Sequence, residues 1–171
     1  FSTFSLTEVC AILLEVERQT EKGYYGAGFV CYEAAAAFDY FLKTKKHGFL
    51  PLLWFGIYRE AETIDINSLD YGDVEELNWQ AEIKKADYLK SIAKIKSYIS
   101  EGETYQVNYT YRLGSEFFGD GFDLFRNLHS GQKGEYSAFI ETESFSICSA
   151  SPELFFSKKG NELISIPMKG T

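Results

Sequence analysis

The sequence has few of the residues that hold small secreted or metal-bound domains together. Its 171 residues include three cysteines, two histidines and three prolines. The cysteines Cys10, Cys31 and Cys148 form no CxxC pair, which argues against a disulfide framework and a structural zinc site. No apolar run approaches the roughly 18 residues of a membrane-spanning helix, and residues 1–6 lack the basic start of a signal peptide. We therefore expect a reduced, cytoplasmic setting and no membrane partner.

Basic residues are also in the minority. The chain carries 17 Lys and Arg against 25 Asp and Glu, a formal net charge of −8. Because nucleic acids attract basic surfaces, we expect no nucleic-acid partner. A small anionic substrate stays possible, since it needs only a local positive pocket. Aromatic residues, at 17%, are abundant and need a core to cover them, which argues against disorder.

The hydrophobic pattern predicts a mixture of helices and strands. Apolar residues recur at helical spacing over residues 5–20 and 84–100, and a short helix is expected over residues 123–129. The expected strands cover residues 24–32, 50–58, 104–113, 135–141, 144–149, 153–157 and 162–166. The links between the later strands are short enough for hairpins. This order predicts an α+β fold.

Three short segments stand out from this background. They are residues 102–108, 149–153 and 166–171, which contain Gln106, Glu153 and Lys169 in turn. Taken singly, each side chain fits an ordinary role. Gln106 suits the wet face of a strand, Glu153 a solvated turn, and Lys169 an exposed loop.

Together the three segments resemble the chorismate-utilising enzyme family, which includes the anthranilate, isochorismate, salicylate and aminodeoxychorismate synthases. The matching motifs are YQVN, SPE and P-x-K-G-T, at residues 105–108, 151–153 and 167–171. The upstream segments GFVCYEAAAAFD and PLLWFGIY resemble the aminodeoxychorismate branch. The resemblance implies two large antiparallel sheets packed together with outer helices. It covers only the front half of the family's catalytic domain, so we expect residues 1–171 to be a truncated N-terminal portion.

The resemblance also implies roles for two catalytic residues. Lys169 stands where anthranilate and isochorismate synthases usually have alanine and aminodeoxychorismate synthases have a lysine that attacks the chorismate ring. A lysine attacks only when neutral, a form that the apolar residues 166–168 would favour. Glu153 matches the general acid that protonates the leaving ring hydroxyl, a role for which we expect burial.

Three further residues match positions that bind the substrate. Gln106 stands where the isochorismate and salicylate enzymes have a lysine that activates water. An amide cannot act as that base, which favours ammonia over water as the nucleophile. Gly170 and Thr171 match a loop whose backbone amide and hydroxyl can hold the ring or a carboxylate.

The resemblance implies chorismate as substrate and a glutamine amidotransferase subunit as the source of ammonia. It also implies one Mg²⁺ ion, bound by two glutamates expected beyond residue 171, and none bound by residues 1–171. We accordingly expect these residues alone to turn over no chorismate. Two alternatives stay open, namely anthranilate synthase component I and a non-catalytic module that binds a small molecule.

Overall fold

The computed structural model describes residues 1–46, 48–132 and 134–168. The chain divides into two compact units, Phe1–Asp70 and Tyr71–Thr171. Helices alternate with strands along the chain, and every strand pairing among the described residues is antiparallel. The expected α+β class with antiparallel sheets is therefore confirmed.

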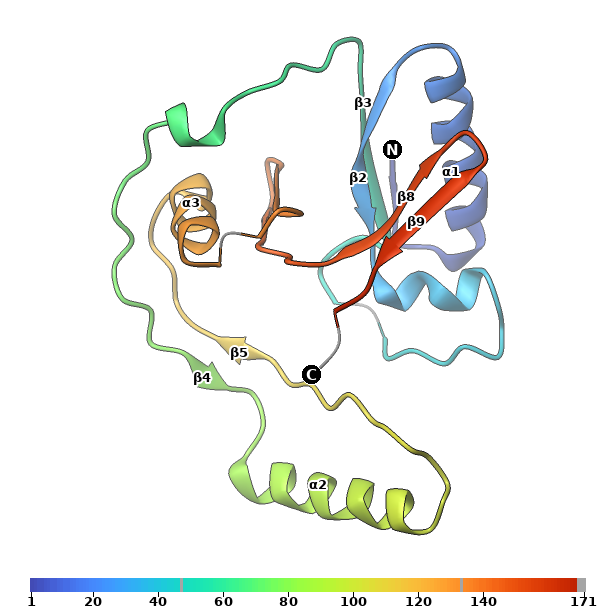
Figure 1. Ribbon diagram of the computed structural model, residues 1–171, viewed down its shortest axis with the longest axis vertical. Coiled ribbons are helices and arrows are strands. Elements are labelled where there is room, and N and C mark those ends of the chain that lie inside the picture. Colours follow the sequence, from blue (N-terminus) through green and yellow to red (C-terminus); the bar gives the residue numbers. More distant parts are fainter. Residues whose placement is uncertain (47, 133, 169–171) are drawn as a thin grey trace. The chain divides into compact units, whose positions relative to one another are not determined.

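The first unit is a three-stranded sheet with a helix packed against it. The sheet order is β1-β3-β2. Figure 1 shows helix α1 beside strands β2 and β3. The bounds are β1 (Ser2–Thr3), α1 (Leu6–Glu21), β2 (Tyr25–Val30), η1 (Tyr32–Ala37), β3 (Leu53–Tyr58) and η2 (Ile66–Ser68). The structure thus confirms the helix expected over residues 5–20 and the strands expected over residues 24–32 and 50–58.

The core of this unit lies between α1, η1 and the sheet. Val9, Ala34, Leu52 and Leu53 are buried together there. Each fully buried leucine contributes roughly 2 kcal/mol through the apolar surface it removes from water. Gly28 on β2 lets the backbones approach, because a Cβ at this position would collide with the carbonyl oxygen of Trp54.

The described residues of the second unit form two α-helices and three two-stranded antiparallel sheets. The pairings are β4 with β5, β6 with β7, and β8 with β9. The bounds are β4 (Gln80–Ala81), α2 (Lys85–Ser100), β5 (Leu113–Gly114), α3 (Gly121–Gln132), β6 (Ala138–Glu141), β7 (Ser146–Ser149), β8 (Leu154–Lys159) and β9 (Glu162–Ile166). The helix expected over residues 84–100 is confirmed, and the short one expected over residues 123–129 is longer at both ends.

Helix α3 packs on the hairpin of β6 and β7 through aromatic rings. The ring of Phe139 on β6 lies 5.5 Å from that of Phe122 and 5.6 Å from that of Phe125. Phe125 is buried, with 4% of its surface exposed. The helix begins after Asp120, whose Oδ1 accepts the backbone N–H groups of Phe122 at 2.7 Å and Asp123 at 3.2 Å. Such an acceptor satisfies donors that the first helical turn leaves unpaired.

The hairpin of β8 and β9 turns at Gly160 and Asn161. Gly160 has a φ of 58°, a left-handed conformation that a residue without a Cβ adopts at little cost. The expected hairpin is confirmed. Large apolar side chains stay exposed along it, namely Phe155, Phe156, Leu163, Ile164 and Ile166.

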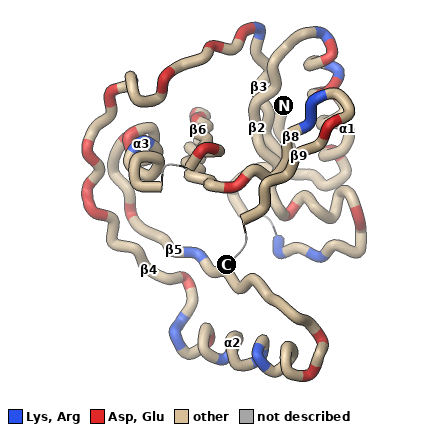
Figure 2. The backbone as a smooth tube through the Cα atoms, viewed as in Figure 1, with Lys and Arg blue, Asp and Glu red and all other residues tan. Residues whose placement is uncertain are grey.

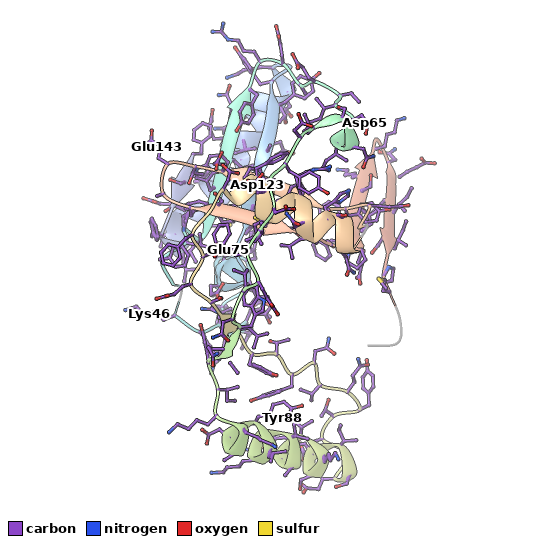
Figure 3. All side chains as sticks on the ribbon, turned by 90° about the vertical axis from the view of Figure 1, so that its left-hand side faces the viewer. Lys46, Asp65, Glu75, Tyr88, Asp123 and Glu143 are labelled. Carbon is purple, nitrogen blue, oxygen red and sulfur yellow. The ribbon has the colours of Figure 1, made fainter. Side chains whose placement is uncertain are left out.

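The prediction of a long strand over residues 104–113 is wrong. Only Leu113–Gly114 forms a strand, paired with Gln80–Ala81. The alternation of β-forming residues is present, but no described strand provides a hydrogen-bonding ladder beside residues 104–112. These residues contact α2 instead. The ring of Tyr88, labelled in Figure 3, lies 5.7 Å from those of Tyr109 and Tyr111.

Helix α2 shows the amphipathic pattern that its sequence predicts. Tyr88, Ile92 and Ile95 are half-buried. Figure 2 shows the basic residues that α2 carries, whereas acidic residues mark the preceding segment. Over the part of the chain that the structure describes, no helix is both long and apolar enough to cross a membrane.

Candidate functional site

Glu153 lies in the turn between β7 and β8. Pro152, which has no N–H group to donate, separates the two strands. The hydroxyl of Ser151 closes the turn, because its Oγ accepts the N–H of Glu153 at 3.2 Å and donates to the carbonyl of Glu153 at 3.0 Å. The side chain of Glu153 is exposed, so the burial expected for a general acid is not observed in this structure.

The structure brings two of the three predicted segments together. The backbone N–H of Met168 donates to Oε2 of Glu153 at 3.2 Å, across 15 positions of sequence. Met168 directly precedes Lys169, so the carboxyl group contacts the segment that leads to the expected nucleophile. Lys169, Gly170 and Thr171 themselves lie outside the described residues, and their roles stay predictions.

Gln106 lies in the segment that follows α2. Gly102, with a φ of 81°, ends the helix as its sequence position suggests. The carbonyl of Gln106 accepts the Thr104 hydroxyl at 3.0 Å, and its Nε2 lies 3.5 Å from Oδ1 of Asn108. Within the described residues these polar contacts stay inside residues 104–108, and no hydrogen bond joins Gln106 to Glu153.

Sequence reasoning missed the residues that support the Glu153 turn. The carbonyl oxygen of Ser151 accepts the N–H of Tyr136 at 3.2 Å. A Cβ on Gly134 would lie 2.6 Å from that same oxygen, so this position requires glycine for the turn to dock. The loop around Gly134 is closed by Ser137, whose Oγ donates to the Gly134 carbonyl at 2.7 Å. A glycine just after a helix was the available signal, but it indicates only where the helix ends.

Helix α3 also holds the backbone of Gly72. Oδ1 of Asp123, labelled in Figure 3, accepts the Gly72 N–H at 2.7 Å, and Nδ2 of Asn127 donates to the Gly72 carbonyl at 3.1 Å. Arg126 is buried beside them, with its guanidinium 4.7 Å from the centre of the Tyr71 ring. Its Nε has no hydrogen-bond partner among the residues that the structure describes. These contacts fix the first residues of the second unit to α3.

Each unit has a hollow whose lining includes no residue of the three motifs. One of about 480 Å³ in the first unit is lined by Glu33, Lys43, Lys45 and Lys46 together with apolar residues. One of about 260 Å³ in the second unit is lined by carboxylates that include Asp73, Glu75 and Glu116. No group of three or more potential metal ligands occurs among the described residues. The expected magnesium ion stays a prediction.

A family model described as chorismate binding enzyme matches residues 3–171. Among curated proteins, aminodeoxychorismate synthase component 1 of Klebsiella aerogenes is 31% identical over 93 residues, which is 54% of this chain and 21% of the relative. The Bacillus subtilis protein of the same name is 34% identical over 84 residues, covering 49% of this chain and 18% of that protein. The chain thus spans about a fifth of the length of these relatives.

Two further matches carry the name of anthranilate synthase. Anthranilate synthase component 1 of Lactococcus lactis is 26% identical over 156 residues, covering 84% of this chain and 34% of that protein. The crystal structure of anthranilate synthase component I from Streptococcus pneumoniae matches with a TM-score of 0.67 and 18% identity, covering 82% of this chain and 41% of that one. The chain therefore shares the fold of the matched part of that structure. With a family match over nearly its whole length, the chain belongs to the chorismate binding enzyme family.

Proposed function

We propose that the chain is part of an aminodeoxychorismate synthase component I. This enzyme converts chorismate to 4-amino-4-deoxychorismate, on the way to para-aminobenzoate and folate, with ammonia from a glutamine amidotransferase partner. The observation that carries the proposal is the lysine at position 169, sixteen residues after Glu153. By resemblance, lysine at this position separates the aminodeoxychorismate branch from the anthranilate branch. The relatives from Klebsiella aerogenes and Bacillus subtilis, which bear the same name, support it.

The proposed reaction forms and breaks two bonds at the ring. The neutral amine of Lys169 bonds to the ring while the ring hydroxyl leaves as water, protonated by the carboxyl of Glu153. Ammonia then bonds to the carbon that carried the hydroxyl, the bond to Lys169 breaks, and the departing amine takes up the proton that ammonia loses. The hydrogen bond from Met168 to Glu153 supports this assignment, because it holds the acid beside the segment that precedes Lys169.

The remaining motif residues have binding roles in this proposal. Gln106 offers an amide where a water-activating base would need a titratable group, which favours ammonia as the nucleophile. Gly170 and Thr171 hold the ring or a carboxylate through a backbone amide and a hydroxyl. Magnesium is proposed to bind through glutamates beyond residue 171.

The test is the identity of the product. The protein, purified as its gene encodes it, is incubated with chorismate, Mg²⁺ and ammonium. The products are separated by chromatography and identified by mass spectrometry. We expect 4-amino-4-deoxychorismate, and Lys169→Ala should lower its rate of formation about 10³-fold, because the covalent route is lost. Lys158→Ala, which removes an exposed lysine of β8, is the matched control and should leave the rate unchanged.

Other products or binding without turnover would support different functions. Formation of anthranilate would overturn the proposal in favour of anthranilate synthase component I, which the long match to the Lactococcus lactis protein makes the second candidate. Saturable binding of chorismate without turnover, unaffected by Lys169→Ala, would instead identify a non-catalytic binding module.

A further inference from the structure

The carboxyl group and the backbone of Glu153 are held by different partners. The backbone N–H and C=O both bond to the hydroxyl of Ser151, at 3.2 and 3.0 Å. The carboxyl accepts the N–H of Met168 at 3.2 Å. Because the side chain of Glu153 is exposed, burial does not fix its position. These hydrogen bonds are therefore what determines where the carboxyl points.

Ser151 can serve as a fixed point because it is itself anchored. Its carbonyl oxygen accepts the N–H of Tyr136 and lies where a Cβ on Gly134 would collide with it. The loop of residues 134–137 is bonded to α3, since Oγ of Ser137 lies 3.1 Å from Nδ1 of His129. A continuous set of contacts thus runs from α3 through the 134–137 loop to Ser151 and then to Glu153.

Pro152, which lies between Ser151 and Glu153, makes the turn depend more on the Ser151 hydroxyl. Pro152 has no N–H, so it cannot donate a backbone hydrogen bond to a neighbouring strand. Among the described residues, Ser151 Oγ is the side-chain group that bonds to the backbone of Glu153. A serine hydroxyl has one donor and two acceptor sites, which allows it to satisfy both the N–H and the C=O. Replacing it with a methyl group would leave both without this partner.

The geometry points to Ser151 as the positioning residue for Glu153, acting through the backbone of the turn and not on the substrate. This assignment rests on the proposed function, in which Glu153 protonates the leaving hydroxyl. Proton transfer requires the acid within hydrogen-bond reach of the oxygen it protonates, so a small displacement of the turn lowers the rate. Ser151 should consequently affect turnover more than substrate binding.

A double-mutant cycle tests the assignment in the protein as its gene encodes it. Steady-state kinetics with chorismate, Mg²⁺ and ammonium are measured for Ser151→Ala, Glu153→Gln and the double variant. We expect Ser151→Ala to lower kcat about tenfold and to change KM less than twofold. In the Glu153→Gln background the same substitution should change kcat less than twofold, because the group it positions is already gone.

Two matched variants separate positioning from folding. Ser151→Thr keeps the hydroxyl and should retain at least half of the kcat. Ser165→Ala removes another serine hydroxyl of the same unit, which donates to the Phe155 carbonyl at 2.7 Å, and should leave kcat unchanged. If Ser165→Ala lowers kcat as much as Ser151→Ala does, the loss reflects the stability of the hairpin and the assignment falls.

The remaining outcomes are also decisive. Equal losses for Ser151→Ala with and without Glu153 would show that Ser151 acts independently, which overturns the assignment. Should Glu153→Gln keep full activity, the proposed role of Glu153 fails whatever Ser151 does. If Glu153→Gln has no detectable activity, the double-mutant cycle cannot be read. The assignment then stands if Ser151→Ala lowers kcat but not KM and Ser151→Thr retains the activity, and it falls otherwise.

Discussion

The two units of the chain differ in where their buried side chains lie and where their motifs lie. Phe1–Asp70 has a closed core, in which Val9, Ala34, Leu52 and Leu53 are buried together. In Tyr71–Thr171 the buried hydrophobic residue among those described is Phe125. All three predicted site segments nevertheless belong to this second unit. Packing therefore stabilises the first unit, whereas local hydrogen bonds shape the site in the second.

Loss of the first core is the largest effect expected from this comparison. Leu53 lies on β3 with none of its surface exposed, so Leu53→Ala should lower the free energy of unfolding of this unit by about 2–5 kcal/mol. Hydrogen exchange read peptide by peptide should show faster exchange within residues 1–70 and little change within residues 71–168. Leu163→Ala, at a leucine 69% exposed, is the control and should change neither. Equal acceleration of both regions by Leu53→Ala would show a single cooperative body.

A smaller effect is expected where a hydrogen bond, not packing, begins a helix. Asp120→Ala removes the acceptor for Phe122 and Asp123 and should destabilise α3 by about 1 kcal/mol. Asp120→Asn keeps an acceptor oxygen and should cost much less. Hydrogen exchange of peptides within residues 121–132 measures both. If the two substitutions had the same effect, capping by Asp120 would be refuted.

The smallest effect expected concerns the cysteines. Burial raises the pKa of the Cys31 and Cys148 thiols, and the nearby carboxylates of Glu33 and Glu141 raise the pKa further. Cys10 is exposed and should be alkylated first by iodoacetamide at pH 8, with the other two roughly tenfold slower. Mass spectrometry of timed digests measures the order. Modification of Cys148 before Cys10 would show that the second unit opens more readily than its structure implies.

The raised pKa values of these two thiols also predict how stability changes with pH. Their folded-state pKa values lie above the ordinary thiol value, so the folded state binds more protons in the alkaline range. Their contribution to stability is complete at neutral pH and is lost as the pH rises through the folded-state values. An increase in the free energy of unfolding with pH in the alkaline range would contradict the raised pKa of the two thiols.

The sequence predicted helices and strands from local patterns, and it failed at residues 104–112, where the pattern is present but a pairing strand is not. The periodic apolar residues of α1 and α2 were sufficient, because a helix satisfies its own backbone hydrogen bonds. The hairpin around Gly160 was predicted from its short link. Residues 104–112 alternate as a strand should, yet alternation supplies no neighbour, and a strand without a ladder does not form.

The candidate site shows the same limit. Glu153 and the segment before Lys169 were identified through motif resemblance, and the hydrogen bond from Met168 connects them in space. The docking of Ser151 on Gly134 depends on two loops 17 positions apart, and no spacing in either loop indicates it. The exposure of Glu153 agrees with the solvated turn that the residue suggests when taken singly. Its burial was expected from the needs of the chemistry and not from a pattern in the residues.

The exposed apolar side chains of the β8–β9 hairpin have a consequence for solubility. Over the described part of the chain, β8 and β9 pair only with each other. Their outer edges and the exposed Phe155, Phe156, Leu163 and Ile164 are suited to pairing with other molecules. Lys158 and Lys159 at the turn supply charge that opposes such pairing. Whenever this hairpin is left uncovered, during synthesis or in a shortened protein, its self-association competes with folding, and the charge of the two lysines opposes that association.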